Sequence, residues 1–118
     1  MNLKKTVVCF FAVGLLCSCA TESGIKPQSW AKAVQTADSR EAHLRLAEHY
    51  DEIAQTLEVD AQEEREMLQE YLARPWKYGK RIQSLKSQAS DMVRDLEMAA
   101  KESRQLAEYH RQMADEAP

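Results

Sequence analysis

RPWKYGK, residues 74–80, is the stretch that decides how this chain folds. Pro75 cannot continue a helix that runs into it, and Gly79 tolerates the backbone conformations of a tight turn. On both sides of this stretch, apolar residues recur at alternating steps of three and four for about 35 residues, which is the spacing of a coiled-coil heptad. The sequence therefore predicts two long helices joined by a turn near residues 74–80.

The two runs carry the same pattern. The predicted seam of the first run is His43, Leu46, Tyr50, Ile53, Leu57, Asp60, Glu64, Met67 and Tyr71, with Ala47, Ala54, Ala61 and Leu68 as a neighbouring line. The predicted seam of the second run is Ile82, Leu85, Ala89, Met92, Leu96, Ala99, Ser103, Leu106, His110 and Met113, with Val93, Ala100, Ala107 and Ala114 beside it. Two helices of roughly 50 Å with a short connection between them are expected to fold back on each other.

The apolar stripe of each helix is wider than a two-helix seam requires, which indicates a third neighbour. A short helix within residues 29–38, capped by Ser29 and starting at Trp30, is one candidate, and a second copy of the chain in a homodimer is the other. Asp38 and Glu41 form a capping box that places a helix start at Asp38 or Ser39. The predicted fold is all-α, a long coiled-coil-like antiparallel helical hairpin over residues 39–118 with a short N-terminal helix.

The first 18 residues have the layout of a bacterial secretion signal. Lys4 and Lys5 form a basic start, and an apolar run follows over residues 6–16. That run is about eleven residues long, whereas a membrane-spanning helix needs about twenty. The segment is therefore expected to be a cleaved signal peptide rather than a transmembrane helix.

The signal ends in Leu16-Cys17-Ser18-Cys19, which resembles the lipobox of bacterial lipoproteins. The resemblance implies cleavage before Cys19 and acylation of that residue, with diacylglycerol on the thiol and a further acyl chain, such as palmitate, on the new amino terminus. Because Ala20 follows instead of Asp, it also implies sorting to the outer membrane, facing the periplasm. The alternative is an ordinary secretory signal cut near Ala20, which leaves Cys19 as a plain thiol. Residues 19–28 are polar and are expected to be a lipidated tether.

Removing residues 1–18 leaves one small domain. Cys9 and Cys17 depart with the signal and Cys19 carries lipid, so no disulfide is expected and packing alone must hold the fold. The net charge is −3 for the full chain and −5 after Lys4 and Lys5 are removed. An acidic protein outside the cytoplasm is a poor nucleic-acid binder, which excludes that class of function.

Two histidines lie at the open end of the predicted hairpin. Folding the chain about residue 77 or 78 places His43 in the same layer as His110 and Met113, or one layer away. Two imidazoles and a thioether are ligands for Cu or Zn, and a histidine pair also responds to pH. The alternative is a polar layer that closes the end of the coiled coil. His49 lies six residues after His43, on another face of the helix.

The turn is basic and aromatic. Between residues 74 and 86 there are five basic residues and no acidic ones, whereas residues 39–73 hold ten acidic residues and three basic ones. Such a tip suits an anionic surface or an acidic envelope protein. The alternatives are pairing within the chain, with Glu70 opposite Lys86, and aromatic rings that cover the end of the core. The candidate partner-binding residues are Arg74, Trp76, Lys77, Tyr78, Lys80 and Arg81.

Asp60 and Glu64 interrupt the first seam in mid-helix. Buried there, they require an arginine such as Arg65 or Arg94, or a partner; otherwise they turn to solvent. The sequence contains no nucleophile arrangement and no glycine-rich phosphate loop, so we expect no enzyme activity and no cofactor. The predicted function is a membrane-anchored structural or adaptor lipoprotein, similar to the many small helical periplasmic lipoproteins without an assigned activity. The alternative is a periplasmic metal-binding or stress-responsive protein that uses His43 and His110.

Overall fold

The computed structural model describes residues 29–118. The predicted signal peptide, residues 1–18, and the predicted tether, residues 19–28 with Cys19, lie outside the described residues. In chain order, the elements are α1 (Trp30–Thr36), α2 (Arg40–Ala73), the 3₁₀ segment η1 (Pro75–Arg81) and α3 (Ile82–Glu116). Within residues 29–118 there is no β-strand, which confirms the all-α prediction.

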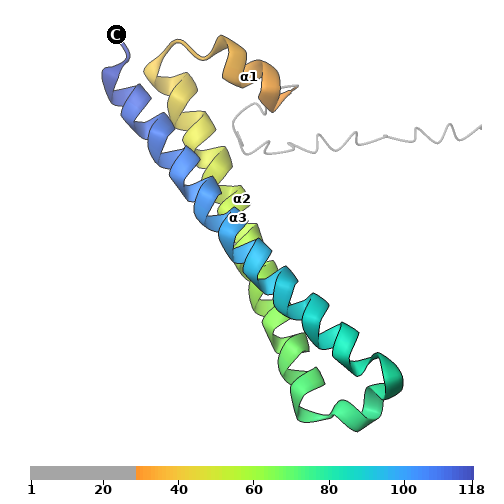
Figure 1. Cartoon of the computed structure of the whole chain (residues 1–118). Coiled ribbons are helices and arrows are strands. Elements are labelled where there is room, and N and C mark those ends of the chain that lie inside the picture. Colours follow the sequence, from red (N-terminus) through yellow and green to blue (C-terminus); the bar gives the residue numbers. More distant parts are fainter. Residues whose placement is uncertain (1–28) are drawn as a thin grey trace, which may run out of the picture.

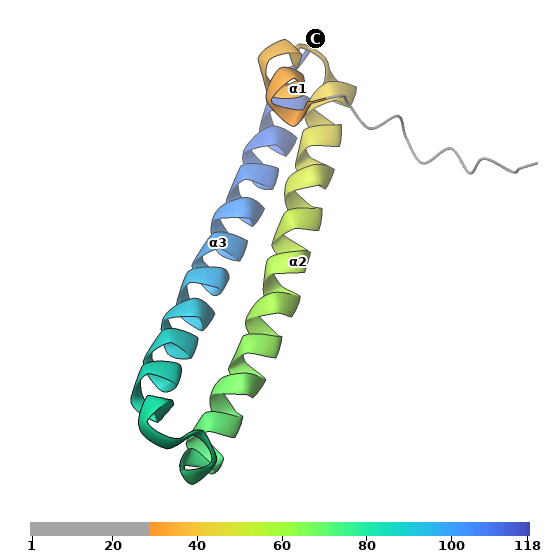
Figure 2. The same ribbon diagram turned by 90° about the vertical axis from the view of Figure 1, so that its right-hand side faces the viewer.

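The two long helices lie side by side and run in opposite directions, as Figures 1 and 2 show. α2 has 34 residues and α3 has 35, so each is about 50 Å long. α1 packs against α2 at the end of the hairpin opposite the turn, beside the C-terminus of the chain (Figure 1). The predicted long antiparallel hairpin with a short N-terminal helix is confirmed. None of the helices between residues 29 and 118 combines the length and the apolar character that crossing a bilayer requires.

Serine hydroxyls start both N-terminal helices. The side chain of Ser29 accepts a hydrogen bond from the backbone N–H of Lys32 and begins α1. The side chain of Ser39 accepts one from the N–H of Ala42 at 3.2 Å and begins α2. The predicted capping box on Asp38 is therefore wrong by one residue, because Ser39 has the extended backbone of a cap and its oxygen reaches the first turn.

The turn is built by a proline and a glycine. α2 is capped by Arg74, whose N–H donates to the carbonyl of Glu70, and Pro75 follows at the first position of η1. Gly79 has φ +60° and ψ −142°, a conformation that interrupts the helical backbone before α3 begins. Only glycine adopts this region readily, so Gly79 redirects the chain into the second long helix.

Alanines form the centre of the seam between α2 and α3. Apart from Leu46, every buried apolar side chain among residues 29–118 is an alanine: Ala47, Ala54, Ala61, Ala89, Ala100, Ala107 and Ala114. Three on α2 and three on α3 recur at steps of seven. Because a methyl group is the only side chain between the backbones there, the helices approach closely along this line.

This arrangement corrects the predicted seam. The residues that directly precede the alanine line stand at the edge of the interface: the exposed fractions are 45% for Met67, 50% for Met92, 41% for Leu106 and 45% for Met113. We call the half-exposed row formed by Leu85, Met92, Ala99, Leu106 and Met113 of α3, together with Ile53 and Met67 of α2, the apolar flank. The predicted row that contains His43, Ala89, Ser103 and His110 is buried, as predicted. The other predicted row is displaced by one position, so that Ala107 and Ala114 are buried in place of Leu106 and Met113. The homodimer stays a prediction.

The opposite edge of the interface carries ion pairs at steps of seven on each helix. Asp51, Glu58 and Arg65 of α2 meet Arg111, Arg104 and Glu97 of α3 in that order. Arg104 also lies 3.8 Å from Asp51, so Asp51 is close to both arginines of the ladder, Arg104 and Arg111. Each charged residue of the ladder on α2 faces a residue of opposite charge on α3. This ion-pair ladder therefore matches one register of the antiparallel pair. The sequence reasoning did not identify the ladder.

Candidate functional site

His43 and His110 meet at the open end of the hairpin, as predicted. Their Nδ1 atoms lie 3.2 Å apart, and the side chains are buried, with 7% and 9% of their surface exposed. Their rings stack at a centroid distance of 5.4 Å. The two residues are 67 positions apart in the sequence, and they meet because the chain folds back at the turn.

One proton joins the two rings. A hydrogen bond between two Nδ1 atoms requires one ring to donate its N–H and the other to accept, so the accepting ring is neutral with its proton on Nε2. Burial lowers the pKa of His110, and the neighbouring His43 lowers it further when charged. His110 therefore favours its uncharged form.

An aromatic stack extends this pair to α1. Tyr50 lies parallel to His110, with ring centroids 5.6 Å apart, and His49 follows beside Tyr50. The ring of Trp30 stacks on His49 at 3.6 Å with an interplanar angle of 8°. Burial lowers the pKa of His49, an effect that the charge of Glu52 partly opposes. The stack joins α1 to the hairpin, and the sequence reasoning missed it because it links residues of three different helices.

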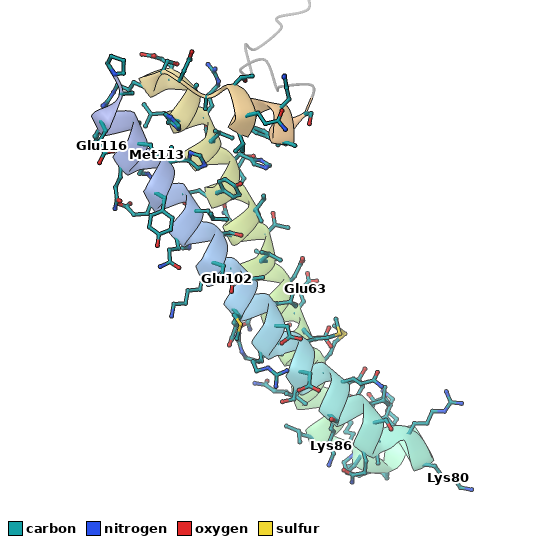
Figure 3. The ribbon with its side chains drawn as sticks, turned by 45° about the horizontal axis from the view of Figure 1, so that its top comes forward. Glu63, Lys80, Lys86, Glu102, Met113 and Glu116 are labelled. Carbon is teal, nitrogen blue, oxygen red and sulfur yellow. The ribbon has the colours of Figure 1, made fainter. Side chains whose placement is uncertain are left out.

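Met113, the third candidate ligand, stays a prediction. Met113 lies near His110 at the open end of α3, where 45% of its surface is exposed (Figure 3). Across residues 29–118, no group of three His, Cys, Asp or Glu side chains is placed to hold a metal ion. The site therefore provides two imidazole nitrogens as metal ligands. Any further ligand would have to be a group other than a His, Cys, Asp or Glu side chain of residues 29–118.

At the opposite end of the hairpin, Glu70 organises the tip. Its carboxylate accepts hydrogen bonds from Arg74 at 3.2 Å, from Lys77 at 3.4 Å and from the hydroxyl of Tyr78 at 3.1 Å. Burial alone raises the pKa of Glu70, but these three donors outweigh it and lower the pKa below its usual value. The predicted pairing of Glu70 with Lys86 is wrong, because the nearer donors of the turn occupy the carboxylate.

All of the predicted tip residues except Tyr78 are exposed. Trp76 is 78% exposed, so the alternative in which it covers the end of the core is wrong for this residue, whereas Tyr78 is half-buried with its ring edge-on to Tyr71. Lys80 extends from the tip in Figure 3, whereas Lys86 is half-buried on α3. In the described part of the chain, no carboxylate lies within ion-pair distance of Lys80, Arg81 or Lys86. The tip thus displays one indole ring and three uncompensated cations.

Asp60 and Glu64 form no site. Asp60 is exposed and Glu64 is half-buried at the edge of the interface. Arg65 instead pairs with Glu97, and Arg94 pairs with Asp91 and Asp95. The prediction that the side chain turns to solvent is confirmed for Asp60. The reason is that the interface is centred on the alanine line, whereas Asp60 lies in the neighbouring row of larger side chains.

Comparisons of the chain with protein-family models, with curated proteins and with solved structures find no match.

Proposed function

We propose that this protein is a lipid-anchored rod of the bacterial envelope, an adaptor that binds its partner through the basic tip. The lipobox-like Leu16-Cys17-Ser18-Cys19 supports the anchor at Cys19, which is ten residues before Ser29. The partner-binding residues are Arg74, Trp76, Lys77, Tyr78, Lys80 and Arg81. The proposed location is the outer membrane, on its periplasmic side, and no enzyme activity is part of the proposal.

One observation carries the proposal: the charged tip lies at the opposite end of the rod from the segment that follows the anchor. α1, the first described element, lies at the open end of α2, and the tip is one helix length away (Figure 2). Because α2 is about 50 Å long, a lipid on Cys19 holds the open end near the membrane and allows the tip to extend away from it. Two or more acyl chains on one cysteine hold a protein firmly on a bilayer.

The experiment is a crosslinked pull-down from cell envelopes with the full chain as bait. One variant reverses tip charges, Lys80→Glu with Arg81→Glu. A matched control makes the same charge change on the outer faces of the arms, Arg45→Glu with Lys101→Glu, where both residues are exposed. The proposal expects crosslinked material that the tip variant loses and the control retains, and expects Cys19→Ala to release the protein from the membrane fraction. Equal recovery with both charge variants would contradict the adaptor role.

A metal-binding function is the second candidate, and the spacing of the histidines favours it. Tetrahedral zinc with bonds of about 2.0–2.1 Å to nitrogen sets two of its ligands roughly 3.3 Å apart, close to the 3.2 Å between the Nδ1 atoms of His43 and His110. Zinc or copper titration of the full chain and of His43→Ala with His110→Ala tests it. Binding that the double variant retains, or no binding at all, removes this candidate.

A further inference from the structure

We propose that the tip of the hairpin docks on the anionic headgroups of a lipid bilayer. The identification of this bilayer as a second one, which faces the anchoring membrane, rests on the function proposed above. Three features of the tip lead to this partner: its uncompensated positive charge, its exposed tryptophan and its convex shape.

The first feature is charge that the fold leaves unpaired. Glu70 draws in Arg74 and Lys77, and these two cations also stay partly exposed, with 59% and 57% of their side-chain surface open to solvent. Lys80, Arg81 and Lys86 have no carboxylate of residues 29–118 within ion-pair distance. Moreover, Lys80 and Arg81 stand directly before the N-terminus of α3, where the helix dipole disfavours cations. Five basic side chains therefore lie at or near the turn, and only two of them form an ion pair within residues 29–118.

The second feature is Trp76. At 78% exposed, it is the most exposed large apolar side chain in the described part of the chain. An indole ring so placed gives up no packing when it enters a lipid surface, and tryptophan favours the headgroup region, where its ring is buried and its N–H stays hydrated. Neighbouring lysine and arginine side chains reach anionic headgroups from the same depth.

The third feature is shape, which separates a bilayer from a peptide or a folded partner. The turn projects as the end of the rod in Figure 2, and Trp76, Lys77, Gly79, Lys80 and Arg81 are all exposed there. A surface hollow lies instead in the middle of α2, where Val59 and Asp60 are among its lining residues. A protein partner is usually held in complementary packing around a buried anchor. A soft, flat headgroup layer accommodates a convex tip without a groove.

The contacts of Glu70 keep this tip in one orientation. The carboxylate ties the turn to the last turn of α2 through Arg74, Lys77 and Tyr78, and the ring of Tyr78 packs edge-on against Tyr71. Trp76 lies inside this tied segment, between Pro75 and Lys77. The indole therefore leaves the rod along a fixed direction, which spares the entropy of ordering a loose loop on binding.

The test uses the full chain, extracted from envelopes and reconstituted into vesicles of phosphatidylcholine. Fluorescent target vesicles are then added, either of phosphatidylcholine alone or of phosphatidylcholine mixed with phosphatidylglycerol, and their capture is measured by flotation. We expect capture of the anionic vesicles only, weakened by high salt because salt screens the headgroup charge. Lys80→Glu with Arg81→Glu should weaken capture by at least about twentyfold, from about fivefold for each basic residue near an anionic surface.

A second readout follows the indole itself. In a Trp30→Phe background, which keeps an aromatic ring against His49, Trp76 is the remaining tryptophan of the chain. Its emission should shift to shorter wavelength and resist acrylamide quenching with anionic targets. No shift and no capture would overturn the proposal, as would equal capture of neutral targets or equal loss in Arg45→Glu with Lys101→Glu.

The outcomes separate this inference from the function on which it rests. If the protein does not float with the phosphatidylcholine vesicles, the anchor fails, and direct binding of the chain to anionic vesicles still tests the tip. If the envelope pull-down yields a protein crosslinked at the tip and anionic vesicles are not captured, the adaptor stands and the lipid partner is wrong.

Discussion

At the scale of single residues, the buried pair His43 and His110 couples the stability of the open end to pH. The folded protein holds the pKa of His110 below its ordinary value of 6.5, so between the folded and the unfolded pKa the unfolded chain binds more protons. Stability is then fully present above about pH 6.5 and is lost as the pH falls through the folded pKa. His49, on which Trp30 of α1 stacks, also has a lowered pKa. Its protonation therefore likewise reduces stability as the pH falls.

We predict that His110→Gln reduces this dependence. The midpoint of thermal unfolding, followed by circular dichroism from neutral pH to about pH 5, should fall steeply in the original protein and less in the variant, because the variant has no imidazole to protonate at that position. His49→Gln is the comparison, since it leaves the pair of Nδ1 atoms in place. An unchanged fall in His110→Gln would show that the pair does not set the pH response.

Gly79 tests the turn at the same scale. A Cβ at this position meets no atom within 4 Å, so Gly79→Ala introduces no clash, but the backbone must hold φ +60°. We expect a loss of about 1–3 kcal/mol in the free energy of unfolding, which is the usual cost of such a conformation for a residue with a side chain. Urea unfolding measures it, with Ser84→Ala, an exposed site early in α3, as the control. Equal stability of the two variants would mean that the turn is not held in this conformation.

At the scale of the elements, the alanine line sets how closely α2 and α3 pack. Ala54 is fully buried, so Ala54→Leu forces a larger side chain between the two backbones. We predict a loss of about 1–3 kcal/mol in urea unfolding, the usual cost of overpacking. Gln105→Leu adds the same side chain on the exposed face of α3 and should change stability by less than about 0.5 kcal/mol. A stabilising Ala54→Leu would place the seam on another row.

The ion-pair ladder is the second feature that holds α2 and α3 together. Arg104→Glu replaces a bidentate partner of Glu58 with a like charge and sets it near Asp51, so the thermal midpoint should fall. Adding Glu58→Arg restores the main pair with its charges exchanged, and we expect partial recovery, because the contact with Asp51 stays repulsive. The pairs are exposed and screened, so low ionic strength is the condition in which to measure them. Additive losses in the double variant would contradict a direct pairing.

The elements were predictable to a large degree, and the seam between them less so. Heptad spacing together with Pro75 and Gly79 predicts both helices, the turn and the meeting of His43 with His110. Hydrophobicity, however, ranks methionine and leucine above alanine as core residues, whereas close backbone approach favours the smallest side chain. Asp60, which lies in the row of larger side chains, carried the signal for the correct centre. Charged residues at steps of seven on each helix, with opposite charges at the facing positions of the other helix, likewise carried the signal for the ladder.

At the scale of the whole molecule, the protein is a thin rod with different ends. The fully buried apolar core of residues 29–118 consists of Leu46 and alanines, while a wide row of larger side chains stays half-exposed. A core of this size gives modest stability, and small domains of this kind commonly gain more from a partner or a membrane. Because small alanine side chains fill the seam between α2 and α3 in the described residues, we expect function from the ends and faces of the rod.

The measurement that tests the central claim most directly is the distance of each end of the rod from the membrane. Because Cys9 and Cys17 leave with the signal and Cys19 is acylated under the proposal, an introduced cysteine is the only thiol. A dye at Glu41→Cys or at Lys80→Cys then reports energy transfer from a bilayer probe. The account predicts strong transfer at residue 41 and a tip roughly 50 Å further from the bilayer, from the rise of the helix. Equal transfer from both positions would contradict it.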